Sequence, residues 1–221
     1  MKKLSFFILF LFLFSCRTMP AINPPDDSTD KNLFSCPDPF LKEGYRFIHA
    51  IEYRTAGHPG NSMIGVTVAD PVLRSLSCAM MTAEGMVLFE AETAPDGIKI
   101  SRAIPPFDSE VFAKNMIDDI RLIFMKPEGN LRTIGYLADG SKNCRYREKN
   151  GDVTDVIENK FDGMAIKRYS SSGELERHVR LIKTTNPYQT IELLADETFD
   201  YSLLMNLIEA QPVKKQAFKR K

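Results

Sequence analysis

The chain has 221 residues, with 29 basic and 29 acidic side chains, and therefore carries no formal net charge when its histidines are neutral. This length is sufficient for one domain with a sizeable core. The balanced charge gives no indication of nucleic-acid binding. The sequence contains no CxxC spacing, which argues against a thioredoxin-like redox site and against a zinc site.

Residues 1–15 have the organisation of a secretory signal peptide. Two lysines follow Met1, and Leu4–Phe14 form an almost unbroken apolar run. This run is too short to span a bilayer core as a helix, which needs roughly 20 residues. Its end, "LFSC", resembles the bacterial lipobox, in which the cysteine receives a diacylglyceryl group and the chain is cut before it. We therefore expect a lipid anchor on Cys16; a non-lipidated signal peptide is the alternative.

A lipid anchor predicts attachment to the cell outer membrane, with the protein facing the periplasm. Arg17 follows the cysteine, whereas an aspartate there retains lipoproteins at the inner membrane in enterobacteria-like sorting. Residues 16–40 contain five prolines and several Asp, Ser and Asn residues, which predicts a flexible tether. The folded domain is expected over residues 41–210. The basic segment 211–221 is either a solvated terminus or a contact for anionic lipid headgroups.

Three cysteines remain after Cys16 is assigned to the anchor, so at most one intramolecular disulfide can form. Cys36 and Cys144 lie in loop-like surroundings and can pair. Cys78 lies in the apolar stretch "SLSCAMM" and is interpreted as a small buried hydrophobic residue.

From Tyr45 the dominant apolar period is two, which predicts strands. In "RFIHAIEYR" Phe47, His49 and Ile51 share one face, and the stretch "GHPGNS" is expected to be a turn. "MIGVTVAD", "LRSLSCAMM", "GMVLFEAE" and "GIKISRAI" follow as strands, and the Pro105-Pro106 pair ends the ladder.

The pattern changes to a helical one between Asp108 and Met125. Apolar residues recur there at three- and four-residue steps: Phe112, Met116, Ile117, Ile120, Ile123 and Phe124. Asp108 or Ser109 is the expected N-cap, and Lys126-Pro127 ends the helix. The polar residues, among them Asp118 and Asp119, are expected to lie on the solvent-exposed face.

Strand patterns return after the helix, with turns at "KNGD" and "SSSG". The last apolar run, Tyr201 to Ile208, fits either a strand or a short helix. Several antiparallel strands with one inserted helix indicate an α+β domain. Stretches such as Met86–Phe89 are apolar on both faces, so the sheet needs a cover, which a packed helix or a ligand can provide.

Catalytic and metal-binding motifs are not evident in the sequence. The three histidines are scattered, and HExxH, GxSxG and phosphate-binding glycine loops do not occur. We therefore expect no catalytic residues, no metal and no cofactor. The prediction is a binding or structural module rather than an enzyme, with an unrecognised hydrolase as an alternative.

The layout is similar to that of a family of small bacterial outer-membrane lipoproteins of unknown function related to the LolA/LolB lipoprotein carriers. The resemblance rests on the lipobox and proline-rich tether, on "IPPFDSEVFAKNMIDDIRLIFMKPEGNL", and on the late "NPYQTIELL". It implies a strongly curved antiparallel β-sheet, or half-barrel, with the inserted amphipathic helix covering its concave face. In that superfamily acyl chains bind inside the cavity. The sequence has no tryptophan, and the apolar loop with which the outer-membrane carrier contacts the bilayer has no counterpart that we can place.

These observations lead to the hypothesis of a lipid-anchored envelope protein that binds acyl chains or lipoproteins in an apolar cavity. The residues expected to form the cavity or its lid are Phe112, Met116, Ile117, Ile120 and Phe124, facing positions such as Val66, Leu88 and Ile100. The alternative is a structural or protein-interaction lipoprotein without a ligand. The expected partners are the membrane, through the lipid anchor, and acyl chains or lipoproteins, but not nucleic acid; the sequence predicts no oligomeric state.

Overall fold

The computed structural model describes residues 19–25, 35–55, 58–159, 163–182, 188–195 and 201–213. The expected signal peptide, the anchor residue Cys16 and the basic residues 214–221 lie outside these ranges, so their predictions stay predictions. All structural statements below refer to the described residues.

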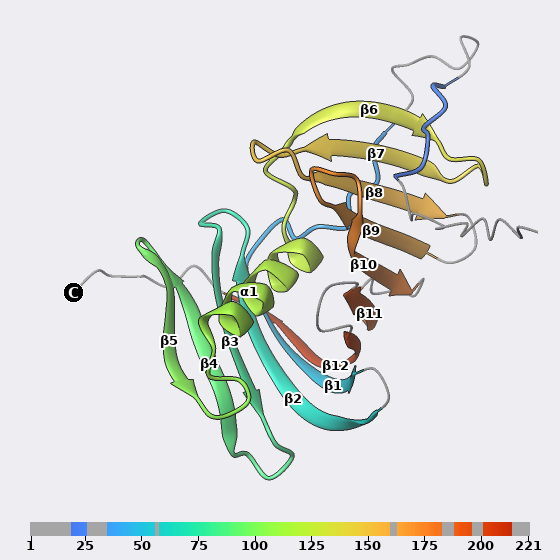
Figure 1. Cartoon of the computed structure of the whole chain (residues 1–221). Coiled ribbons are helices and arrows are strands. Elements are labelled where there is room, and N and C mark those ends of the chain that lie inside the picture. The colour runs from blue at the N-terminus through green and yellow to red at the C-terminus, as the bar shows by residue number, and fades with distance from the viewer. Residues whose placement is uncertain are drawn as a thin grey trace, which may run out of the picture.

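Within these ranges, twelve strands form one antiparallel sheet, and a single α-helix interrupts their succession (Figure 1). The first group of strands comprises β1 (Tyr45–Thr55), β2 (His58–Asp70), β3 (Ser75–Met81), β4 (Val87–Ala94) and β5 (Gly97–Ala103). The helix α1 (Glu110–Phe124) follows. The second group comprises β6 (Asn130–Tyr136), β7 (Lys142–Arg147), β8 (Val153–Asn159), β9 (Gly163–Tyr169), β10 (Leu175–Ile182), β11 (Thr190–Ala195) and β12 (Tyr201–Pro212).

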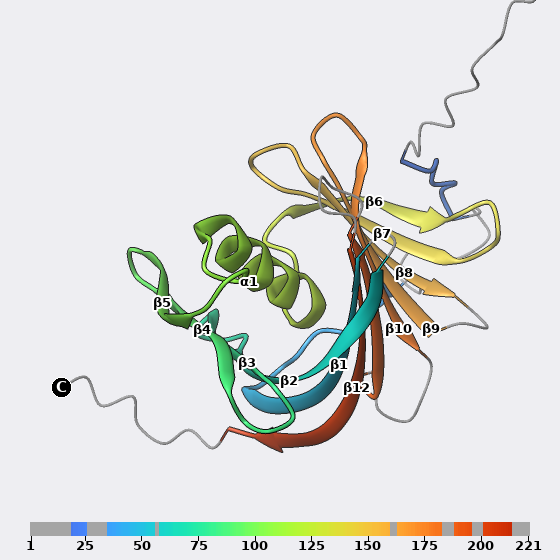
Figure 2. The same cartoon turned by 60° about the horizontal axis from the view of Figure 1, so that its bottom comes forward.

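The two groups join because the first strand pairs with the last. The strand order is β5-β4-β3-β2-β1-β12-β11-β10-β9-β8-β7-β6, and Ile51 on β1 lies opposite Met205 on β12. The undecided run from Tyr201 is therefore a strand. Figure 2 shows the sheet bending sharply, with α1 between the β3–β5 part and the β6–β10 part. The α+β class and the curved antiparallel sheet are confirmed.

One face of the sheet, here called the inner face, carries continuous rows of buried side chains, because paired residues of antiparallel strands point to the same side. On the first group of strands one row consists of Phe47, Thr67, Cys78 and Ala91, all buried. A second row starts at Tyr53 on β1 and crosses the other group through Leu203, Leu193, Val179, Ile166, Val156, Cys144 and Ile134. Tyr53, Leu203 and Ile134 are partly buried. The inner face is thus apolar almost from one sheet edge to the other.

The register of two strands differs from the prediction. Val66 pairs with Ile48 and Ala79, which places it on the face opposite to Phe47. Leu88 likewise precedes the fully buried Phe89, so the predicted inward direction of Val66 and Leu88 is wrong by one residue. The cause is that these strands are apolar on both faces, and a shift of one residue reverses every side chain. In addition, most of the predicted turn "GHPGNS" belongs to β2.

The ends of α1 agree with the sequence. Ser109 is the N-cap, and its side-chain oxygen accepts a hydrogen bond from the backbone N–H of Phe112 at 3.1 Å. Such a cap satisfies one of the backbone donors that a helix N-terminus leaves unpaired. Met125 is the C-cap, directly before Lys126-Pro127.

Parts of the segment expected to be a flexible tether contact the domain, so that prediction does not hold for them. Asn23 exchanges two backbone hydrogen bonds of 2.8 Å with Tyr136 on the edge strand β6. A disulfide joins Cys36 to Cys144 on β7, the two cysteines that the sequence left available for pairing. Farther along, the backbone N–H of Leu41 donates to the carbonyl of Phe124 at 3.0 Å.

Candidate functional site

The large apolar side chains of α1 become less buried toward its N-terminus, although the small Ala113 there is only 1% exposed. Ile117, Ile120 and Phe124 are buried, with no more than 6% of any of these residues exposed. Phe112 and Met116, closer to the N-terminus of the helix, are half-buried and pack at the margin of the core. This gradient is the first feature of the candidate site.

Aromatic side chains fix the C-terminal half of α1 to the sheet. The ring of Phe124 stacks on Phe47 of β1, with 4.8 Å between the centroids, and lies 5.3 Å from Tyr188. Contacts of this kind contribute about 0.5–1.5 kcal/mol per pair beyond the buried area. The hydroxyl of Tyr188 in turn donates to the backbone carbonyl of Pro39, which ties the N-terminal segment to the same cluster.

The N-terminal half of α1 has looser surroundings. Phe112 meets Phe89 of β4 edge-to-face at 5.2 Å and Phe107 at the same centroid distance. Ile98 and Ile100 of β5, the outermost strand of this half of the sheet, are also half-buried and pack against the same core. Apolar groups that retain exposure in this way form a margin that a further apolar molecule can cover.

A buried ion pair connects the middle of α1 to the other half of the sheet. Asp119 Oδ1 accepts a hydrogen bond from Nε of Arg177 on β10 at 2.8 Å, and its second oxygen accepts one from the hydroxyl of Tyr201 on β12. Asp119 and Arg177 are both 4% exposed. Burial raises the pKa of Asp119, and the adjacent guanidinium opposes that rise.

The burial of Asp119 contradicts the prediction that it lies on the exposed face of the helix. The sequence did contain a signal, because Asp119 follows Met116 by three positions and precedes Ile123 by four. These are the spacings of residues on one helix face. Arg177 and Tyr201 carried no such signal, since only the fold brings them to Asp119.

His49 is a second polar group on the inner face. It is 1% exposed, lies 5.8 Å from Phe47 and 6.4 Å from Phe124 between ring centroids, and neither ring nitrogen has a hydrogen-bond partner. Burial lowers its pKa to about 4, against a small opposing effect of the Tyr188 backbone. The ring is therefore neutral near pH 7.

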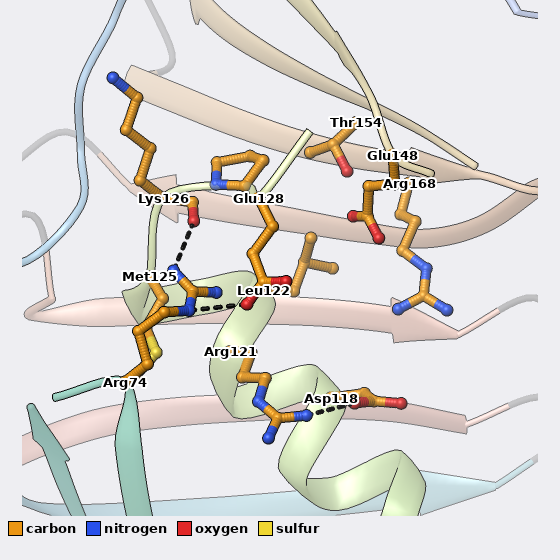
Figure 3. A pocket seen from close by; sticks show the side chains of 11 residues that line it. Arg74, Asp118, Arg121, Leu122, Met125, Lys126, Glu128, Glu148, Thr154 and Arg168 are labelled. Carbon is orange, nitrogen blue, oxygen red and sulfur yellow. Dashed lines mark hydrogen bonds and ion pairs between the residues drawn. The ribbon is translucent and has the colours of Figure 1, made fainter. Parts of the chain in front are cut away.

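A polar pocket of about 160 Å³ lies at the C-terminal end of α1 (Figure 3). Charged side chains line it from three sides: Arg74 from the turn between β2 and β3, Asp118 and Arg121 from α1, and Glu148 and Arg168 from the β7–β9 region. The lining is completed by Leu122, Met125, Lys126, Pro127, Glu128 and Thr154. The sequence gave no indication of this pocket, since its lining comes from segments far apart along the chain.

Other kinds of site are not evident in the described part of the chain. No group of three or more His, Cys, Asp or Glu side chains there could hold a metal ion. No helix within the same ranges is both long enough and apolar enough to cross a membrane. Cys78 is a free buried thiol, as predicted, and burial raises its pKa to about 12.

No protein-family model matches the sequence, and a search of curated proteins finds no match. Among solved structures, the chain is similar to a LolA superfamily protein from Nitrosomonas europaea, with 10% identity and a TM-score of 0.44, over 79% of this chain and 88% of that one. It is also similar to a domain from Vibrio parahaemolyticus assigned to outer membrane lipoprotein sorting, with 11% identity and a TM-score of 0.46, over 80% and 88% of the two chains. Because both TM-scores lie below 0.5, the proposals below rest on the residues and contacts of this chain.

Proposed function

We propose that this protein is a lipid-anchored protein of the outer membrane, facing the periplasm, which binds acyl chains between α1 and the concave inner face of its sheet. In this proposal the helix covers the concave face and acts as a lid, and the protein is a binding module, not an enzyme. The acyl chain belongs to a lipid or to a lipoprotein.

The observation that carries the proposal is the unequal burial of the large apolar side chains along α1. The C-terminal half is held by the Phe124 stack and by the Asp119–Arg177 ion pair. The N-terminal half contacts β4 through the ring pair of Phe112 and Phe89, and both Phe112 and Met116 are only half-buried. A helix fixed at one end and loosely packed at the other can admit an apolar molecule at the loose end.

The ligand-binding region therefore comprises Phe107, Phe112 and Met116 together with Ile98 and Ile100 on β5. Burial of apolar surface is favourable by about 25 cal/mol for each Å² removed from water, and this hydrophobic effect drives the binding of an acyl chain. Met116 is suited to such a contact, because its flexible thioether adapts to ligands of variable shape.

Photo-crosslinking of the full chain with a diazirine-bearing palmitate in phospholipid vesicles tests the proposal. We expect crosslinks in the peptide that contains residues 107–116, and a reduction of several-fold in the Met116→Ala variant. Ile120→Glu should abolish crosslinking, because a carboxylate placed in an apolar site loses its hydration without gaining a partner. Because Ile120→Glu also destabilises the fold, the Met116→Ala variant is the deciding test of acyl-chain binding.

A matched control is Met86→Ala, since Met86 is 57% exposed in the turn between β3 and β4. It should label as the wild type does. Uniform labelling over the surface, unchanged by Met116→Ala, would contradict the proposed site and favour a structural lipoprotein without a ligand.

Anchoring is tested separately at Cys16. Stable membrane attachment requires at least two acyl chains, which lipoprotein processing supplies. Cys16→Ala should therefore move the protein from the membrane fraction to the soluble fraction of lysed cells. Tight membrane association of the variant would refute the lipid anchor.

A further inference from the structure

The polar pocket at the C-terminal end of α1 combines two kinds of unsatisfied group. Thr154, Glu148 and Arg168 lie together on one side of it, and Arg74 with Glu128 lies on another (Figure 3). Its volume of about 160 Å³ exceeds the ~10–15 Å³ that a single water needs by more than ten times. It is thus large enough for a small molecule.

The positive groups of the pocket retain hydrogen-bond donors. Arg74 Nε pairs with Glu128 at 2.7 Å, and its Nη1 donates to the carbonyl of Lys126 at 3.3 Å. Arg121 pairs with Asp118 at 3.2 Å. Arg168 Nε pairs with Glu176 at 3.2 Å, and its Nη2 lies 4.0 Å from Asp152. A guanidinium has five N–H donors, so these pairs use only part of each fork. Arginine forks match the oxygens of a phosphate. The lining holds four cationic side chains, of Arg74, Arg121, Lys126 and Arg168, against the three carboxylates of Asp118, Glu128 and Glu148.

The acceptor groups of the pocket lack partners. Thr154 is 1% exposed, and its hydroxyl has no hydrogen-bond partner. Glu148 is half-buried, and no hydrogen bond reaches its carboxylate from the described residues. Burial raises its pKa, as do the nearby carboxylates of Asp152, Glu128 and Asp118, and Arg168 opposes the rise. Both groups can accept hydrogen bonds from an ammonium.

A ligand with one charge satisfies only part of this pocket. A simple anion at the arginines is repelled by Glu148, and a simple cation at Glu148 is repelled by Arg168 and Arg121. A molecule that carries both charges a short distance apart meets both sets of groups.

We propose that this pocket binds a small zwitterion in which a short linker joins a primary ammonium to a phosphate. The ammonium lies at Glu148 and Thr154, and the phosphate lies at Arg168, Arg121 and Arg74. This chemistry occurs in free phosphoethanolamine and in the headgroup of phosphatidylethanolamine. The lipid source rests on the function proposed above, whereas the free source does not.

Isothermal titration calorimetry of the full chain in an uncharged detergent tests the assignment with three probes: phosphoethanolamine, inorganic phosphate and ethanolamine. Phosphoethanolamine should bind at least about tenfold more tightly than either single-charge probe, as expected when charge-assisted hydrogen bonds form at both ends. Dihexanoyl phosphatidylethanolamine distinguishes the sources, because tighter binding of this lipid than of phosphoethanolamine identifies a headgroup site.

Two variants locate the two ends of the ligand. Glu148→Gln should remove the preference for phosphoethanolamine over phosphate, and Arg121→Gln should weaken both probes. Glu158→Gln is the matched control, since Glu158 pairs with Lys142 and does not line the pocket. Circular dichroism and thermal melting establish that each variant is folded.

Three outcomes would overturn the assignment: no binding of phosphoethanolamine, equal binding of phosphate alone, or a Glu148→Gln variant that behaves as the wild type. Because phosphoethanolamine has no acyl chain, these outcomes leave the acyl-chain proposal untouched. Conversely, phosphoethanolamine binding together with failed palmitate crosslinking would separate the pocket from that function.

Discussion

At the residue scale, His49 gives the domain a pH dependence that the sequence alone did not reveal. The histidine was placed correctly on the face of Phe47 and Ile51, but its complete burial without a partner depends on Phe124 and Tyr188. In the unfolded chain its pKa is about 6.5, and in the folded chain it is about 4. The unfolded state therefore binds the proton first as the pH falls.

We expect the stability contributed by neutral His49 to be lost between about pH 6.5 and pH 4, and to amount to roughly 3 kcal/mol in total. Urea unfolding at pH 7 and pH 4.5 should show that the free energy of unfolding falls less between these pH values in His49→Leu than in the wild type. His178, which is half-buried on β10, is the control position. Equal losses in His49→Leu and wild type would exclude His49 as the cause.

Asp119 shows how local and long-range information differ at this scale. Its helical spacing to Met116 and Ile123 was visible in the sequence, yet a carboxylate on an apolar stripe is stable only with a buried partner. That partner, Arg177, is 58 positions away and belongs to another part of the sheet. The local pattern indicated the helix face on which Asp119 lies, but it could not identify the buried partner that stabilises its carboxylate there.

At the element scale, local sequence patterns predicted the strands and the helix. They did not predict the registers of the strands or which segments pack against the sheet. Period-two runs located most strands, and a capping serine with a terminal Lys-Pro bounded α1. The inward faces of β2 and β4 were misassigned because both faces are apolar. Residues 19–25 were assigned to a flexible tether on composition, but the edge strand β6 offers unpaired backbone groups that Asn23 satisfies.

The contact between residues 19–25 and β6 depends on a glycine. A Cβ at position 135 would lie 2.0 Å from the backbone oxygen of Asn23, so Gly135→Ala should displace the segment. The Tyr136 amide, which donates to Asn23, should then exchange its hydrogen faster. Gly44→Ala is the control, because its Cβ meets atoms no closer than 3.5 Å. Unchanged exchange at Tyr136 in Gly135→Ala would show that this contact does not protect the edge.

At the scale of the whole molecule, the domain is one open sheet whose two halves are joined by the pairing of β1 with β12, and α1 and a disulfide connect distant parts of it. No local pattern specifies that β1 pairs with β12, since the pairing joins residues 146 to 167 positions apart. The Cys36–Cys144 bond spans 108 positions, and both partners lie in segments that the sequence described only as loop-like.

Removing this disulfide should destabilise the domain substantially. A closed loop of about 100 residues corresponds to roughly 4–5 kcal/mol in the chain-entropy description, and measured effects are commonly about 2–4 kcal/mol. Dithiothreitol should therefore lower the urea midpoint of the wild type. It should leave a Cys36→Ser/Cys144→Ser variant unchanged, because the remaining thiol of Cys78 is buried and free. A wild-type midpoint insensitive to complete reduction would contradict this expectation.

The most direct test of acyl-chain binding is native mass spectrometry of the full chain released from detergent micelles, with and without added palmitate. Because α1 is firmly held at Phe124 and loosely packed at Phe112, we expect a bound or exchangeable species whose mass corresponds to one acyl ligand. This species should be depleted in Met116→Ala and retained in Met86→Ala. A wild-type protein that carries no lipid beyond the proposed covalent anchor on Cys16 and takes up no palmitate would contradict acyl-chain binding and favour the alternative of a structural envelope protein.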